Sequence, residues 1–80
     1  MKIYIVIIED RHSDTEAKPF SDAAKAIAYA EKTAHEYCRY EDDYEESLND
    51  AMKKAGWLWH ATYSCEGDNV RVLEREVDGA

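Results

Sequence analysis

The strongest constraint on the fold is a run of six consecutive β-branched or aromatic residues, from Ile3 to Ile8, near the N-terminus. Charged residues bound this run, so the pattern predicts a β-strand over Lys2–Asp10. Because the side chains on both faces of the strand are apolar, we expect both faces to be covered. The 80 residues of the sequence allow one domain, residues 1–80, with one small core.

An amphipathic helix is predicted from Asp22 to about Arg39, after a polar connection at Arg11–Lys18. Ser21 stands where a helix N-cap belongs. Apolar residues recur at spacings of three and four, which is the helix period. They are Ala23, Ile27, Ala30, Ala34 and either Tyr37 or Cys38. The alanines make this stripe shallow, so the helix can lie close to a sheet.

The residues after Arg39 predict a break in the chain and then a second helix from about Tyr44 to Ala55. Gly56 is expected just beyond its C-terminal end, where a left-handed residue usually stops a helix. One long helix over residues 22–55, bent near Asp42, is the alternative interpretation.

The C-terminal third predicts a β-hairpin. Apolar and polar residues alternate from Trp57 to Cys65, Glu66–Asn69 has turn composition, and Val70–Val77 forms the returning strand. The element order is then β-α-α-β-β. We predict an α+β fold in which a three-stranded antiparallel sheet, in the order first–third–second, has the helices packed on one face.

This strand order leaves the most apolar strand at an edge of the sheet. An exposed apolar edge invites pairing, and proteins normally cover it. Either the second helix wraps round the edge or another chain pairs with it. The second option is a homodimer, or pairing with another partner, through Lys2–Glu9.

The charge balance excludes several classes of function. Ten Lys and Arg stand against eighteen Asp and Glu, which gives a formal net charge of −8. A chain this acidic lacks the basic surface that direct binding to nucleic acid or to an anionic membrane requires. No apolar run approaches the roughly 20 residues of a membrane span, and the N-terminus lacks a signal-peptide pattern. We therefore expect a cytoplasmic protein.

The most unusual local feature is a concentration of acids between residues 36 and 50, called the acidic segment below. Seven of these fifteen residues are Asp or Glu, against one base, Arg39. Three tyrosines are interleaved with them, and tyrosine is enriched in protein interfaces. The acids can simply solvate the surface, or they can present carboxylates to a groove rich in Arg and Lys. The second hypothesis assigns partner binding to Glu36, Tyr37, Tyr40, Glu41, Asp42, Asp43, Tyr44, Glu45, Glu46 and Asp50.

Two sets of residues have the character of metal ligands. Asp10, His12 and Asp14 alternate in a loop and could ligate a divalent cation. The second set is His35, Cys38, His60 and Cys65. Strand alternation places His60 and Cys65 on opposite faces, which argues against one shared ion. We expect no metal or cofactor, and we expect Cys38 to face Cys65 as a small core residue; whether the two are paired stays open.

The remaining aromatic and motif patterns favour a structural core and no catalysis. Trp57, Trp59 and Tyr63 form an aromatic row at strand spacing, which we expect to receive the alanine-rich helix. The chain has no phosphate-binding glycine loop, nucleophile elbow or paired zinc motif. We therefore expect that the protein is not an enzyme and has no catalytic residues.

In general character the chain resembles the small acidic inhibitors encoded by bacteriophages and other mobile elements, of the anti-CRISPR type. The resemblance rests on the 80-residue length, the opening Met1-Lys2-Ile3-Tyr4, the β-α-α-β-β order and the run Tyr40–Glu46. It implies a protein that mimics nucleic acid and blocks a larger basic protein, such as a Cas nuclease or surveillance complex, in the host cytoplasm. One alternative is a homodimeric structural or adaptor domain. The other is a small metal- or ligand-binding protein that uses His12 and nearby acids.

Overall fold

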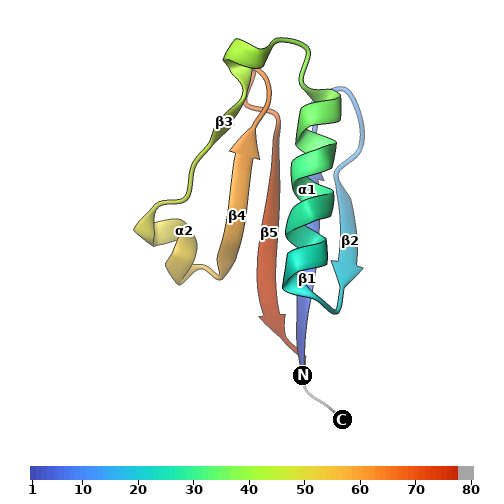
Figure 1. Cartoon of the computed structure of the whole chain (residues 1–80), viewed down its shortest axis with the longest axis vertical. Coiled ribbons are helices and arrows are strands. Elements are labelled where there is room, and N and C mark those ends of the chain that lie inside the picture. The colour runs from blue at the N-terminus through green and yellow to red at the C-terminus, as the bar shows by residue number, and fades with distance from the viewer. Residues whose placement is uncertain (78–80) are drawn as a thin grey trace.

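Five antiparallel strands form one sheet, and the longer helix lies across one face of it (Figure 1). The structure is a computed structural model that describes residues 1–77. The strands are β1 (Lys2–Glu9), β2 (Glu16–Phe20), β3 (Glu45–Glu46), β4 (Trp57–Thr62) and β5 (Asn69–Glu76). The helices are α1 (Ala23–Tyr37), α2 (Asp50–Lys54) and the 3₁₀ turn η1 (Glu41–Asp43). The predicted α+β class is confirmed, whereas the predicted number of strands is wrong.

The sheet order is β2-β1-β5-β4-β3. The predicted β4–β5 hairpin and the antiparallel pairing of β1 with β5 are confirmed. The prediction that β1 lies at an edge is wrong, because β2 pairs with it from Tyr4 opposite Phe20 to Ile8 opposite Glu16. An edge strand can be polar, and it tolerates Pro19, which lacks a backbone donor. For this reason β2 carries no apolar pattern from which it could be predicted.

The region between α1 and β4 holds two short elements in place of the long helix predicted over Tyr44–Ala55. Glu45 and Glu46 pair with Thr62 and Ala61 of β4 as the strand β3. The helix α2 starts only at Asp50, where the Asn49 side chain accepts a hydrogen bond from the Met52 amide at 2.9 Å. Two separate helices are therefore confirmed, and a single bent helix is excluded.

The core lies between α1 and the sheet face that it covers. Ala26, Ala30 and Ala34 are fully buried and belong to one apolar cluster with valines of β1 and β5. Since alanine has a short side chain, α1 can approach the sheet closely, as its sequence predicts. The N-cap differs from the prediction by one residue. Asp22, and not Ser21, accepts a hydrogen bond from the Lys25 amide at 3.1 Å.

The opposite face of the sheet has no helix behind it within residues 1–77 (Figure 1). It carries the odd-numbered isoleucines of β1, because neighbouring residues of a strand point to opposite faces. A register shift in β4 places Trp57 opposite Leu73 and Trp59 opposite Val72, so the two tryptophans lie on different faces. The predicted aromatic row is therefore confirmed in part, because Trp59 and Tyr63 pack in the core with α1 while Trp57 does not. Of the covering layers predicted for the two faces of β1, residues 1–77 supply a helix on one face only.

The two turns after α2 and β4 contain glycines with positive φ, +91° at Gly56 and +90° at Gly67. A Cβ at Gly56 would lie 2.8 Å from Arg75 Nη1 and 3.2 Å from the Glu74 carbonyl oxygen. A Cβ at Gly67 would have no neighbour within 4 Å. An alanine would therefore meet the same backbone strain at both sites, and close contacts only at position 56.

We expect Gly56→Ala to lower the free energy of unfolding by about 2 kcal/mol, and Gly67→Ala by about 1 kcal/mol. The left-handed backbone penalises both alanines, and the contacts with β5 penalise only the first. Urea denaturation of the two variants and the parent chain measures the difference. Equal losses would contradict the close approach of β5 to Gly56.

Candidate functional site

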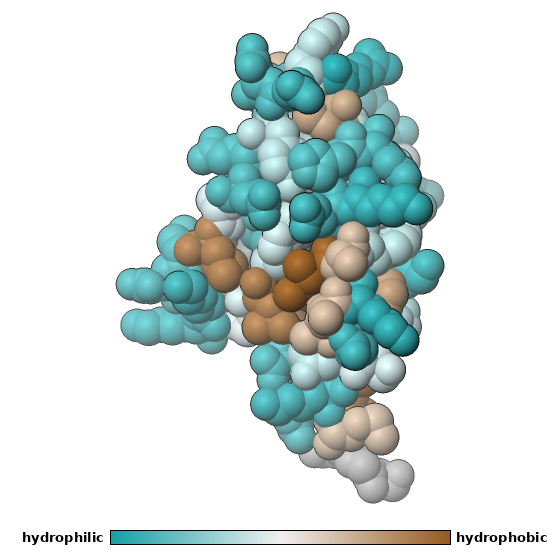
Figure 2. Space-filling model, in the orientation of Figure 1, coloured by the Kyte–Doolittle hydropathy of each residue, from teal (hydrophilic) through white to brown (hydrophobic). Residues whose placement is uncertain are grey.

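The acidic segment runs from the end of α1 over one end of the sheet and down the β4 edge (Figure 1). Its acids are exposed, apart from Asp43, which is partly buried. Figure 2 shows the molecule in the same orientation, from the side that carries α1. Hydrophilic residues cover the upper part of this side, and apolar residues gather lower down. The carboxylates are therefore available to solvent or to a partner.

Most of these carboxylates have no cationic partner within residues 1–77. Glu36 lies 3.9 Å from Lys32 on the preceding turn, and Glu46 accepts a hydrogen bond from Trp59 Nε1 at 2.9 Å. The other acids of the segment make no ion pair with a described residue. Several of the chain's bases bind elsewhere, such as Lys2 with Glu74 at 2.8 Å. The folded chain leaves a strip of negative charge that its own bases do not neutralise.

The three tyrosines of the segment have different environments. Tyr37 and Tyr40 are 46% and 67% exposed. Tyr44 instead stacks on His35, with ring centroids 4.1 Å apart, and packs against the core. Its hydroxyl is buried without a hydrogen-bond partner among the described residues, and burial raises the pKa of Tyr44 to about 12. Two of the three predicted tyrosines can therefore touch a partner directly.

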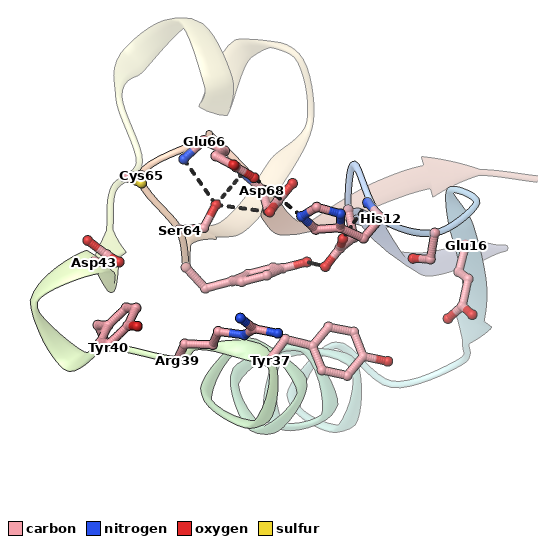
Figure 3. A pocket seen from close by; sticks show the side chains of 13 residues that line it. His12, Glu16, Tyr37, Arg39, Tyr40, Asp43, Ser64, Cys65, Glu66 and Asp68 are labelled. Carbon is pink, nitrogen blue, oxygen red and sulfur yellow. Dashed lines mark hydrogen bonds and ion pairs between the residues drawn. The ribbon is translucent and has the colours of Figure 1, made fainter.

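A cleft of about 680 Å³ opens where the acidic segment leaves α1 (Figure 3). Tyr37, Arg39, Tyr40 and Asp43 line one side of it. The turn at residues 64–68, which joins β4 to β5, and the loop between β1 and β2 line the rest. The cleft thus brings part of the acidic segment beside two loops that are remote in sequence.

Two residues that line the cleft, Tyr63 and Asp10, are joined by a hydrogen bond. Tyr63 is 2% exposed, and its hydroxyl donates to Asp10 Oδ2 at 2.6 Å. The backbone amide of His12 donates to Asp10 Oδ1 at 2.8 Å. These two hydrogen bonds hold the pKa of Asp10 below its usual range, while burial and the Asp10 carboxylate raise the pKa of Tyr63. Tyr37 packs edge-on against the Tyr63 ring at 5.9 Å.

A second carboxylate fixes the two loops to each other. Asp68 is 7% exposed and accepts hydrogen bonds from the Arg11 amide and the Ser64 hydroxyl, each at 2.9 Å. The sequence marks residues 66–69 as a turn but gives no sign that Asp68 also holds the β1–β2 loop. That contact depends on β1 and β5 being neighbours, so it is visible only in the folded chain.

The candidate metal ligands do not come together. No three His, Cys, Asp or Glu side chains of residues 1–77 lie close enough to hold a metal ion. His12 contacts Glu66 at 3.4 Å. Cys38 is half-buried and donates to the Tyr40 carbonyl at 3.0 Å, while Cys65 is exposed, and both are free thiols. The expectation that the two cysteines face each other in the core is wrong, because Cys65 lies in the exposed turn after β4.

Comparison with known proteins finds no match for this chain. No protein family, no curated protein and no solved structure matches the chain. Within the described residues, no helix is long and apolar enough to cross a membrane.

Replacing Tyr63 with Phe should weaken the fold in a pH-dependent way. Because the pKa of Asp10 is lowered in the folded state, its hydrogen bond stabilises the chain above the ordinary pKa of 3.8 and is lost as the pH falls through the lowered value. Asp10 is partly exposed, so we expect a loss of about 1 kcal/mol at pH 7 and much less at pH 2. Urea unfolding at the two pH values measures it. A loss independent of pH would contradict pairing with the ionised carboxylate.

Proposed function

We propose that this chain is a binding protein, not an enzyme, that presents its acidic segment to the basic, nucleic-acid-binding surface of a larger protein. The observation that carries the proposal is the strip of exposed carboxylates without cationic partners among residues 1–77. A surface that binds nucleic acid carries Arg and Lys for phosphate groups. Carboxylates held on a folded scaffold can occupy the same positions and exclude the nucleic acid.

The arrangement of the segment suits such a contact. Exposed charges mainly accelerate association and depend on salt, while desolvated aromatic side chains supply most of the binding energy. Tyr37 and Tyr40 are exposed next to the carboxylates and can supply that energy. The segment starts in α1, passes through β3 and ends in α2, so little conformational freedom is lost on binding.

The resemblance to anti-CRISPR proteins makes guide-loaded Cas effectors the first partners to test. In that form of the proposal, the acidic segment occupies the groove that holds target DNA or guide RNA, and inhibition is steric. A metal-dependent function has no supporting observation, since the candidate ligands are dispersed within residues 1–77. The adaptor alternative depends on self-association, which would use a surface other than the acidic segment.

Two triple variants with the same net charge separate recognition from general acidity. The first, Glu41→Gln/Asp42→Asn/Glu45→Gln, neutralises the acidic segment. The second, Asp14→Asn/Glu31→Gln/Glu76→Gln, neutralises three exposed acids elsewhere. Each changes the formal charge from −8 to −5.

We expect the first variant to bind its partner at least about tenfold more weakly and with a shallower salt dependence, and the second to bind almost as the parent does. The measurement is inhibition of target-DNA cleavage by guide-loaded Cas effectors at 50 and 300 mM salt, with capture from host lysate at the same salt concentrations. Equal effects of the two variants, or none, would contradict a role for the segment in recognition.

A further inference from the structure

The sheet face opposite α1, called the open face below, is apolar along its middle. Ile3, Ile5 and Ile7 of β1 point to this face, beside Leu73 of β5 and Trp57 of β4. None of the five belongs to the apolar cluster that packs against α1. Leu73 is 6% exposed because its neighbours shield it, while the isoleucines and Trp57 stay partly exposed. An ordered row of this kind, without a covering layer, is typical of an interaction surface.

The edges of the sheet do not offer an equivalent surface. β2 carries Lys18 and Pro19, and β3 consists of two glutamates. Charged residues and proline on edge strands are the devices that prevent edge-to-edge pairing. Association through the β1 edge is also closed, since β2 occupies it. Any partner of the apolar strand β1 therefore has to pack on its face.

The charge of the open face favours a second copy of this chain. A protein of charge −8 repels itself over most of its surface. On the open face, Arg71 pairs with Glu9 at 2.7 Å, and Arg75 hydrogen-bonds only to backbone oxygens among residues 1–77. Glu45 of β3 also belongs to this face, because it pairs with Thr62, which pairs with Asn69. Two arginines and two glutamates therefore leave the face without net negative charge, so two acidic molecules can approach each other through it.

The positions of the charges also select one arrangement. Arg75 lies at one end of the open face, opposite Ile3, and Glu9 lies at the other end, opposite Asn69. If two copies pack face to face with their strands running in opposite directions, Arg75 of each copy lies near Glu9 of the other. The parallel arrangement would place Arg75 against Arg75. The two-fold antiparallel arrangement is self-complementary, as a homodimer interface requires.

The size of the face sets the expected strength of association. The strands β2, β1, β5 and β4 have five, eight, eight and six residues and define a face on the order of 400 Å² per copy. A dimer would then bury about 800 Å² in total, which is in the range of weak interfaces. The association should therefore be weak.

We propose that two copies of this chain associate through their open faces, sheet against sheet with antiparallel strands, and form an α-β-β-α dimer. The acidic segment, at the end and outer edge of the sheet, lies outside the centre of this interface. The dimer does not depend on the proposed inhibitory function, and either can fail without the other.

A pair of charge-reversal variants tests the arrangement. Arg75→Glu alone brings the new carboxylate of one copy near Glu9 of the other, and Glu9→Lys alone brings the new ammonium group near Arg75. Each variant should therefore dimerise at least about tenfold more weakly than the parent chain. In an equimolar mixture, each mixed dimer has one contact between the introduced carboxylate and the introduced ammonium group, and one native contact between Arg75 and Glu9. Because Glu9→Lys also removes the pair with Arg71, the mixed dimer should form more readily than the dimer of either variant alone, but less readily than the parent dimer. Sedimentation velocity from 5 to 500 µM measures all three samples and the parent.

A third variant tests the apolar centre of the open face. Ile5→Lys should keep the chain monomeric at 500 µM, whereas Ala28→Lys, on an exposed position of α1, should leave dimerisation unchanged. Far-UV circular dichroism checks that each variant is folded. A parent chain that is monomeric at 500 µM, a mixture that fails to associate, or a folded Ile5→Lys dimer would overturn the proposal. The charge-reversal mixture decides the question if Ile5→Lys does not fold.

Discussion

The structure depends on the packing of the alanine stripe of α1 against the valines of β1 and β5. Ala26, Ala30 and Ala34 are fully buried, as are Val6 and Val72. Short side chains on the helix and branched ones on the sheet let the two layers approach closely, and a larger residue in the stripe would overfill the interface. This contact holds α1 against the sheet. It thereby positions the C-terminal end of α1, where the acidic segment starts and where the cleft opens between Tyr37 and the loops of the sheet.

The sequence predicts those elements whose pattern reflects burial, and it fails where a neighbour decides the structure. The apolar run of β1, the period of α1 and the β4–β5 hairpin have their own signals, and all three are confirmed. β2 is a polar strand that exists because β1 offers an unpaired edge. β3 forms because β4 offers it an edge to pair with, and this pairing overrides the helical pattern of residues 44–49. The cleft was missed for the same reason, since Asp10, Tyr63 and Asp68 meet only through strand pairing.

Charge and hydrophobicity are separated on this molecule. The acidic segment carries exposed carboxylates at one end and one edge, whereas the open face has an apolar centre with an Arg71–Glu9 pair and a further arginine at its rim. Arg71 also lies over the Trp57 ring at 5.3 Å, which shields part of that aromatic surface. Such a distribution fits the proposal that the two surfaces have different partners. In the proposed dimer, repulsion between acidic segments favours contact through the open face, and the net charge of −8 opposes direct binding to nucleic acid.

Protection of a sheet edge offers a simpler account of the acids, and it explains part of the segment. Glu45 and Glu46 form the edge strand β3, where like charges prevent pairing with another molecule. The account does not extend to Glu41–Asp43, which form the turn η1 outside the sheet, nor to Tyr40, which is two-thirds exposed beside them. Edge protection needs no aromatic residue and no charge beyond the strand. The turn η1 and its exposed tyrosine are therefore the part of the segment for which recognition is the better explanation.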